Sequence, residues 1–366
     1  MKLTSMLPEK VANEFNPERL KIARLRRRMT YKKLADTVGL TSKTISKYEN
    51  DSIDNPPSLD SLKKLAKALH YPIEFFLEDD VDTLPVESVS FRALSKMTAS
   101  QRDAAISAGR LGFVVNDYLE DKFQLPSQDF IDLRGFEAEV AAETIREHWL
   151  LGVKRIGNVV HLLESKGARV FSLAENTLDV DAFSFWKDDK PFIFLNNKKS
   201  AERSRFDAAH ELGHLLLHKH ASPFDNHYKD SSVSSRVAEQ EADDFASAFL
   251  MPASSVIEVA PSFVTIDTII ELKSRWAVSA VSLIVRMRKL GLLTEWQYRT
   301  LMKEASIRGF RKSEPKPIDK EKSLIFQKIL PLLAEDGFSV KNFASELKLP
   351  MDEVTNLMFM PSFVGI

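Results

Sequence analysis

The pattern His-Glu-x-x-His at His210 to His214 constrains this chain more than any other feature of its sequence. In a helix, residues i and i+4 lie on one face, so both imidazoles can reach a single metal ion. Zinc lowers the pKa of a bound water to about 7, and Glu211 can take the proton from that water. The pattern predicts a hydrolytic zinc site on a helix, although two surface histidines on an amphipathic helix give the same five residues.

The residues around this pattern, Arg205 to His218, favour the zinc interpretation because most other positions are apolar. A helix that is apolar nearly all round is buried, and buried His and Glu side chains need partners such as a metal. His220 has the spacing of a third ligand in metzincins, but that class needs a Gly at position 217. This chain has Leu217, so we expect the helix to continue and His220 to point elsewhere.

A second helix, Ala238 to Pro252, contains the acidic candidates for the third ligand. Glu239 lies three residues before Ala242 and therefore on the apolar side of this helix, whereas Glu241 falls mostly off that side. We predict that Glu239 is the third ligand. Asp243, one turn later, is predicted to accept a hydrogen bond from a ligand histidine.

These motifs resemble the ImmA/IrrE group of gluzincin-type metallopeptidases, over roughly residues 136–293. The matching residues are Arg203 to Phe206, His210 to His214, His218, Glu239 to Ala246 and Leu250 to Pro252. The resemblance implies one zinc ion per chain, held by His210, His214 and Glu239, with Glu211 as the general base. It implies a structural role for His218. The segments Asp181 to Trp186 and Lys190 to Asn196 look like the two strands that precede the zinc helix in this family.

The charge distribution singles out the N-terminal region. Residues 16–70 contain 13 Lys and Arg against 6 Asp and Glu, a local charge of +7, which leaves −8 for the rest of a chain whose total is −1. A basic head on an acidic body indicates a module that binds nucleic acid, and the simpler alternative is a solvated basic helix face.

The segment Pro17 to Phe76 predicts four or five short helices. Thr30 can cap the N-terminus of the second helix, and Gly39 ends that helix. A third helix runs from Thr41 or Ser42 to near Glu49. Two short helices around a Gly turn are typical of a helix-turn-helix that places its second helix in the major groove. Ile45 and Tyr48 are expected to anchor that helix. The predicted DNA contacts are Ser42, Lys43, Thr44, Ser46 and Lys47 for bases, and basic residues including Arg27 and Arg28 for phosphates.

The stretch Leu34 to Asn50 resembles the XRE family of phage-repressor-type DNA-binding domains. The resemblance covers about residues 17–76, with one departure: Tyr31 stands where the family commonly has a Gln. It implies a double-stranded DNA operator as the partner and a homodimer as the binding form.

Composition and hydropathy exclude several other classes. The chain has no Cys, which rules out disulfides, thiolate zinc sites, a Cys nucleophile and iron–sulfur chemistry. It has only 12 Gly, which favours a helix-rich fold. No apolar run reaches 18 residues, and Met1 to Phe15 lacks the apolar core of a signal peptide, so we expect a cytoplasmic protein with no membrane partner.

We therefore expect a mainly α-helical protein with a small β-sheet, of the α+β class. Its predicted parts are a helix-turn-helix domain (16–77), a linker with a connecting helix (78–135), a zincin-like zinc peptidase domain (136–310) and a C-terminal helical segment (323–366). The charged, Pro-containing stretch Arg311 to Lys322 is predicted to be a linker. The C-terminal segment is open to three roles: a dimer contact, a second DNA contact or a cap on the cleft.

These expectations combine into a DNA-binding transcriptional regulator that carries a zinc-dependent endopeptidase. The ImmA/IrrE resemblance links this chemistry to cutting a repressor, which here is either the chain itself or a partner. One alternative is a transcriptional repressor or antitoxin-type regulator whose peptidase fold is a non-catalytic sensor, and another is a protease that uses its head as an adaptor. Candidates for stabilising the oxyanion are His220, His227 and Tyr228.

Overall fold

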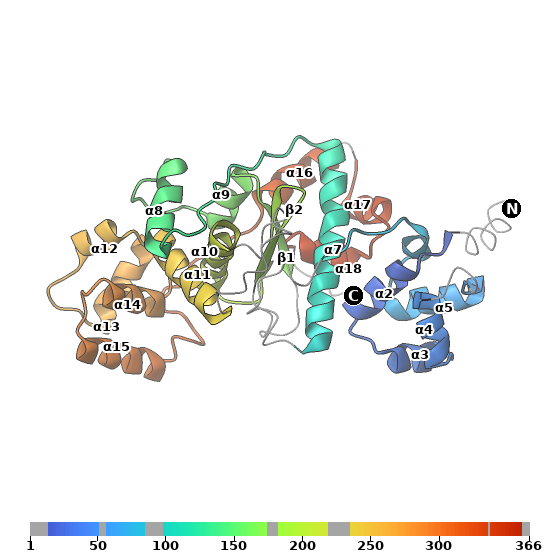
Figure 1. Ribbon diagram of the computed structural model, residues 1–366, viewed down its shortest axis with the longest axis horizontal. Coiled ribbons are helices and arrows are strands. Elements are labelled where there is room, and N and C mark those ends of the chain that lie inside the picture. The colour runs from blue at the N-terminus through green and yellow to red at the C-terminus, as the bar shows by residue number, and fades with distance from the viewer. Residues whose placement is uncertain are drawn as a thin grey trace. The chain divides into compact units, whose positions relative to one another are not determined.

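The computed structural model describes residues 14–50, 56–84, 98–173, 182–218, 235–335 and 337–360, and Figure 1 draws their elements. The chain divides into two compact units. We call residues 1–86, 96–125 and 325–366 the head unit, and residues 87–95 and 126–324 the sheet unit. The mainly helical class with one small sheet is confirmed. Within the described ranges, no helix combines the length and the apolar character needed to cross a bilayer.

The N-terminal part of the head unit is the predicted set of short helices. They are α2 (Pro17–Arg26), α3 (Tyr31–Val38), α4 (Ser42–Asn50), α5 (Leu59–Leu69) and the 3₁₀ turn η1 (Ile73–Leu77). Thr30 caps α3 by accepting a hydrogen bond from the backbone N–H of Lys33. Gly39 ends α3 in the left-handed region, at φ 70°, which a residue without a Cβ adopts freely. Leu34 and Ile45 are buried and join the two helices of the turn.

A buried ion pair ties α2 to α4. Arg24 donates from Nε and Nη2 to the two carboxylate oxygens of Glu49, over 2.6 and 2.7 Å. The Arg24 guanidinium also lies 4.2 Å from the centre of the Tyr31 ring. The sequence predicted Tyr48 as the anchor beside Ile45, but Tyr48 is only half-buried. Glu49 is buried instead, because it pairs with Arg24.

Helices far along the sequence complete the head unit. They are α7 (Ala99–Lys122), α16 (Leu324–Glu335), α17 (Val340–Glu346) and α18 (Met351–Leu357). The first turn of α18 meets the end of α2, where Arg26 Nε donates to Glu353 Oε2 over 2.8 Å and Arg27 Nη1 to Asp352 Oδ2 over 2.7 Å. Tyr118 on α7 donates to Glu346 on α17 over 2.6 Å.

The sheet unit is built on a mixed three-stranded sheet in the order β1-β3-β2. β1 (Arg169–Leu173) runs parallel to β3 (Lys190–Asn196), and β2 (Phe183–Lys187) runs antiparallel to it. Stacked Phe rings, such as Phe183 against Phe194 at 4.8 Å, fill the core of the sheet. The two strands that the sequence predicted are confirmed as β2 and β3.

The described residues of the sheet unit also form eight α-helices and one 3₁₀ turn. They are α8 (Ala138–His148), α9 (Val159–Ser165), α10 (Ala201–Leu217), α11 (Ser235–Leu250), α12 (Ala253–Val259), α13 (Ile266–Leu272), η4 (Lys273–Arg275), α14 (Ala280–Lys289) and α15 (Glu295–Ile307). α10 packs against β2 and β3 on one side and against α11 on another.

The expected continuation of α10 past Leu217 is wrong. His218 has an extended backbone (φ −116°, ψ 130°), and its N–H closes the last turn on the carbonyl of His214. The chain therefore leaves the helix at His218. The three oxyanion candidates, His220, His227 and Tyr228, lie outside the described residues.

The predicted linker at residues 311–322 is not a free connector, because charged contacts fasten it to the sheet unit. Glu314 accepts from the backbone N–H of Ala280 over 2.7 Å and pairs with the buried Lys273. Glu321 pairs with the buried Arg205 and accepts from the first N–H of α9 over 2.8 Å. The charged, Pro-containing composition indicated a linker, because the partners of these charges lie far away in sequence and cannot be recognised from the segment itself.

Candidate functional site

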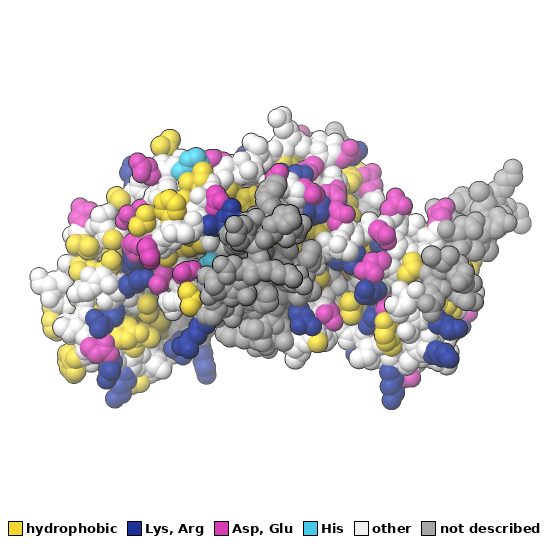
Figure 2. All heavy atoms as spheres, in the orientation of Figure 1, with side chains coloured by type: hydrophobic (Ala, Val, Ile, Leu, Met, Phe, Trp, Pro, Cys, Tyr) yellow, Lys and Arg dark blue, Asp and Glu magenta, His cyan; other side chains and the backbone are white. Residues whose placement is uncertain are grey.

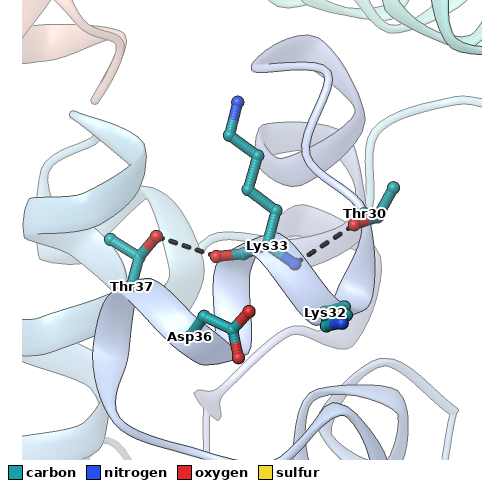
Figure 3. Close-up of a pocket in the computed structure, with 5 residues that line it drawn as sticks. All are labelled: Thr30, Lys32, Lys33, Asp36 and Thr37. Atoms are coloured by element: carbon teal, nitrogen blue, oxygen red, sulfur yellow. Dashed lines mark hydrogen bonds between the residues drawn. The ribbon is translucent and has the colours of Figure 1, made fainter.

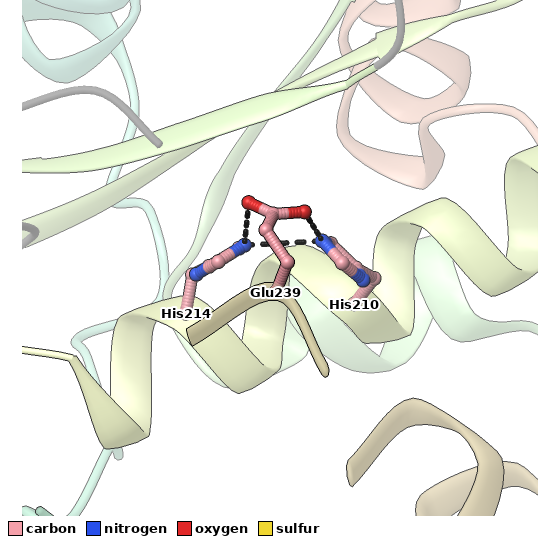
Figure 4. A group of neighbouring side chains, drawn as sticks. All are labelled: His210, His214 and Glu239. Carbon is pink, nitrogen blue, oxygen red and sulfur yellow. Dashed lines mark hydrogen bonds and ion pairs between the residues drawn. The ribbon is translucent and has the colours of Figure 1, made fainter. Parts of the chain in front are cut away.

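Three side chains from α10 and α11 converge in the sheet unit (Figure 4). His210 and His214 project from the same face of α10, with their Nε2 atoms 3.0 Å apart. Glu239, on α11, places Oε1 3.3 Å from His214 Nε2 and Oε2 3.5 Å from His210 Nε2. These residues form a group that could hold a metal ion, with the donor atoms within 4.8 Å of one another.

The spacing of these donors fits a small tetrahedral ion. Zinc binds His nitrogens and carboxylate oxygens at about 2.0–2.2 Å, so tetrahedral ligand atoms lie about 3.3–3.5 Å apart. The three measured separations, 3.0, 3.3 and 3.5 Å, lie at or near that range. Two His and one Glu are also a donor set found at catalytic zinc sites, which keep a fourth position open. The residues present therefore fit a zinc ion.

Gly213 allows the two helices to approach closely enough to share one ion. A Cβ at this position would lie 3.0 Å from the Phe245 ring and 3.3 Å from the Cα of Ala242 on α11. The fourth position of the His-Glu-x-x-His pattern therefore faces the helix that supplies Glu239.

A carboxylate of α11 also meets the far side of the His210 imidazole. Asp243 Oδ1 lies 2.9 Å from His210 Nδ1, in the place that the sequence predicted for it. Burial alone would lower the pKa of His210, but the hydrogen bonds to Asp243 and Glu239 raise it to about 10. Glu241, the competing ligand candidate, contacts His218 instead, with Oε2 3.0 Å from Nε2.

Glu211 lies beside the donor group and faces the sheet. Its side chain is buried, and burial raises the pKa of Glu211 to about 7. Ser184 on β2 donates from Oγ to Glu211 Oε2 over 2.7 Å. The sequence analysis missed Ser184, and the available signal was one hydroxyl within the aromatic run Phe183 to Trp186.

In the head unit, α4 presents the predicted base-contacting residues with graded exposure. Ser42, Lys43 and Lys47 are exposed, whereas Thr44 and Ser46 are half-buried. Thr44 Oγ1 lies 2.8 Å from Thr41 Oγ1 at the start of the helix.

Basic side chains also gather at the beginning of α3. Figure 3 shows an open surface hollow lined by Thr30, Lys32, Lys33, Asp36 and Thr37, in which Thr37 donates to the carbonyl of Lys33 over 2.8 Å. Figure 2 shows Lys and Arg side chains along the edge of the head unit that α3 and α4 form in Figure 1. Lys32, Lys33, Lys43 and Lys47 are the exposed lysines of these two helices.

The two arginines predicted as phosphate contacts lie at the end of α2. All three guanidinium nitrogens of Arg27 bond within the head unit: Nε to the carbonyl of Leu69, and Nη1 and Nη2 to Asp352. Arg28 is half-buried and turns the chain at φ 53°. The structure therefore gives Arg27 a bonding role inside the unit that the sequence did not predict.

Comparison with known families supports both resemblances. Residues 20–76 match the family model for a helix-turn-helix domain, and residues 163–288 match the peptidase M78 model described as an IrrE N-terminal-like domain. The chain thus combines a DNA-binding helix-turn-helix domain of XRE type with an M78 peptidase-like domain. No curated protein matches the chain.

Proposed function

We propose that this chain is a DNA-binding transcriptional regulator with a zinc-dependent endopeptidase, which controls a repressor by hydrolysing a peptide bond. The observation that carries the proposal is the convergence of His210, His214 and Glu239 beside Glu211, in a chain that also has a helix-turn-helix domain. The repressor is the chain itself, a second copy or a separate XRE-type protein, and the regulator binds its operator as a homodimer.

The proposed chemistry assigns a separate task to each side chain. His210, His214 and Glu239 would hold the zinc ion, which when bound polarises a water and the peptide carbonyl. Glu211 takes one proton from the attacking water and delivers it to the leaving amine nitrogen as the C–N bond breaks. The Ser184 hydroxyl donates to Oε2 of Glu211 and holds this carboxylate in place. Burial raises the pKa of Glu211 to about 7, which suits a group that first accepts a proton and then donates it.

In the head unit, α4 is proposed to enter the major groove. The exposed Ser42, Lys43 and Lys47, with Thr44 and Ser46, would contact base edges, and exposed lysines of α3 would contact phosphates. Ala substitution of Ser42 or Lys43 is expected to weaken binding selectively at one operator position.

The first test of the metal centre is zinc content per chain in protein purified without added zinc. We expect one equivalent in the wild type and none in Glu239→Ala, while Glu258→Ala, an exposed acidic residue of the same unit, keeps one equivalent. Zinc retained by Glu239→Ala would assign the third ligand to another residue. No zinc in the wild type after zinc is offered would refute the proposed metal centre.

The second test is cleavage, read by mass spectrometry. Zinc-loaded protein is incubated alone and with XRE-type repressors, and Glu211→Gln serves as the inactive control. Products that appear with the wild type and not with Glu211→Gln support the endopeptidase. Bound zinc and operator binding without any cleavage would support the alternative, a repressor with a non-catalytic sensor fold.

A further inference from the structure

A chain of hydrogen-bonded groups leads away from the metal-facing side of His214. Nε2 of His214 faces the donor group, 3.0 Å from His210 Nε2 and 3.3 Å from Glu239 Oε1. Its other ring nitrogen, Nδ1, lies 2.9 Å from Nδ1 of His218. On the far side, His218 Nε2 lies 3.0 Å from Glu241 Oε2. His218 thus connects a predicted metal ligand to a carboxylate.

The two ends of this hydrogen-bonded series, the metal-facing Nε2 of His214 and the Glu241 carboxylate, determine where the protons lie. A ring nitrogen that binds a metal uses its lone pair, so a neutral His214 then has its proton on Nδ1. This Nδ1–H donates to His218 Nδ1, which must be the acceptor, and the proton of His218 is therefore on Nε2. Nε2–H donates to Glu241, because an ionised carboxylate only accepts. One arrangement of protons satisfies every bond in the chain.

His210 has a shorter hydrogen-bonded connection of the same kind, since its Nδ1 lies 2.9 Å from Asp243 Oδ1. Both connections end on carboxylates of α11, the helix that also supplies Glu239. Positions 239, 241 and 243 therefore act together: the first faces the donor group, and the other two hold the histidines from behind.

The end of α10 puts the His218 ring in this position. The backbone turns extended at His218, while its N–H stays bonded to the carbonyl of His214 over 3.1 Å. The ring is buried and lies 4.9 Å from the His214 ring, between centres. A buried imidazole bonded at both nitrogens has a single orientation.

We propose that His218 is a positioning residue of the metal centre, which with Glu241 holds His214 in the tautomer and orientation that present Nε2 to zinc. This inference rests on the zinc centre proposed above. Hydrogen-bond partners behind zinc-bound histidines change metal affinity by about 10- to 100-fold. His218 then has a role in metal binding without being a ligand.

The test measures the zinc dissociation constant of the full chain by competition with a chromophoric chelator. His218→Phe keeps the ring volume but removes the acceptor, and we expect zinc binding about 10- to 100-fold weaker. His218→Asn can place an amide oxygen where Nδ1 lies, so it should recover part of the affinity. His148→Phe, which removes another His–carboxylate pair of the sheet unit, with Asp129, is the matched control and should not change the affinity.

Two further readouts separate positioning from mere folding. ¹⁵N NMR of the zinc-loaded wild type should show His214 protonated on Nδ1 and His218 on Nε2, and any other pair of tautomers overturns the proposal. Glu241→Ala, at a half-exposed side chain, should weaken zinc binding without opening the buried site. Unchanged affinity in folded His218→Phe and in Glu241→Ala would overturn this inference alone. Failure of the wild type to bind zinc would overturn the proposed metal centre as well.

Discussion

At the scale of single residues, two buried hydroxyl groups of the sheet have different environments. Ser184 on β2 donates to the carboxylate of Glu211, a residue that is only 3% exposed. Ser172 on β1 is equally buried, but its hydroxyl has no hydrogen-bond partner among the described residues. A buried carboxylate that loses a donor keeps its desolvation cost. A buried hydroxyl without a partner also carries an uncompensated desolvation cost, which its removal relieves. The two serines therefore form a matched pair for substitution.

We expect Ser184→Ala to lower the free energy of unfolding by about 1–3 kcal/mol, because it removes a donor from the buried Glu211. It should also lower the rate of peptide hydrolysis while leaving zinc content unchanged, since Ser184 contacts none of the three ligands. Urea unfolding, hydrolysis and metal analysis check these effects. Ser172→Ala should lower none of the three, because it removes a buried hydroxyl that has no partner, and equal losses in both variants would contradict the assigned role of Ser184.

At the scale of elements, the metal centre depends on the close approach of α10 to α11. The Cβ added by Gly213→Ala would lie 3.3 Å from the backbone of Ala242, tighter than most side-chain contacts. Ala is favoured over Gly in a helix by about 1 kcal/mol, but overpacking typically costs about 1–3 kcal/mol. The outcome at this position therefore reports on the contact between the helices.

We expect Gly213→Ala to be destabilising overall and to weaken zinc binding, because α11 must shift and carries Glu239 with it. Calorimetric unfolding and zinc competition measure both effects. Gly157→Ala is the control, since its Cβ would meet nothing within 4 Å and its φ is not in the left-handed region. It should be neutral or stabilising by up to about 1 kcal/mol.

The end of α2 offers a test of which basic residues meet DNA. Arg27→Ala should lower the stability of the head unit and leave the salt dependence of DNA binding unchanged, because the guanidinium bonds to Asp352 and Leu69. Lys33→Ala should reduce the slope of log K against log salt by about 0.9 on any duplex, because this exposed lysine of α3 is one of the proposed phosphate contacts. Fluorescence anisotropy on one duplex at several salt concentrations compares the two. A reduced slope in folded Arg27→Ala would restore the predicted phosphate contact.

At the scale of the whole molecule, the head unit is assembled from segments at both ends of the chain. Glu353 is nearly fully buried and pairs with Arg26, 327 positions earlier. Asp352, the preceding residue, is half-exposed and pairs with Arg27. Removing one partner of a buried pair costs far more than removing one partner of an exposed pair.

Glu353→Ala should therefore destabilise the head unit by about 3–5 kcal/mol, because it leaves Arg26 buried without this carboxylate. Asp352→Ala should cost about 0–1 kcal/mol. Thermal unfolding measures the loss of stability, and native-state hydrogen exchange of the backbone amides in α2 and α5 shows whether that loss lies in the head unit. A small effect of Glu353→Ala would show that α18 contributes little to the head unit.

Much of this molecule could be predicted from local patterns. Thr30 marks the start of α3 and Gly39 marks its end. Both could be predicted because an N-cap and a left-handed turn each depend on only one or two residues. The spacing of His210 and His214 determines that they share a face, and the apolar side of α11 selects Glu239 over Glu241. What could not be predicted are contacts between distant positions, such as Arg24 with Glu49 or the fastening of residues 311–322.

The class of the chain, its two family resemblances and the three candidate ligands follow from the order of the residues, because helical periodicity and motif spacing are local properties. The groups that contact those ligands from behind, and the contacts that hold the head unit together, emerge when the chain folds. Ser184 meets Glu211, Glu241 meets His218, and Glu353 meets Arg26 because folding brings separate elements together. A buried polar group is stable only beside its partner, and no pattern within one element specifies a partner on another.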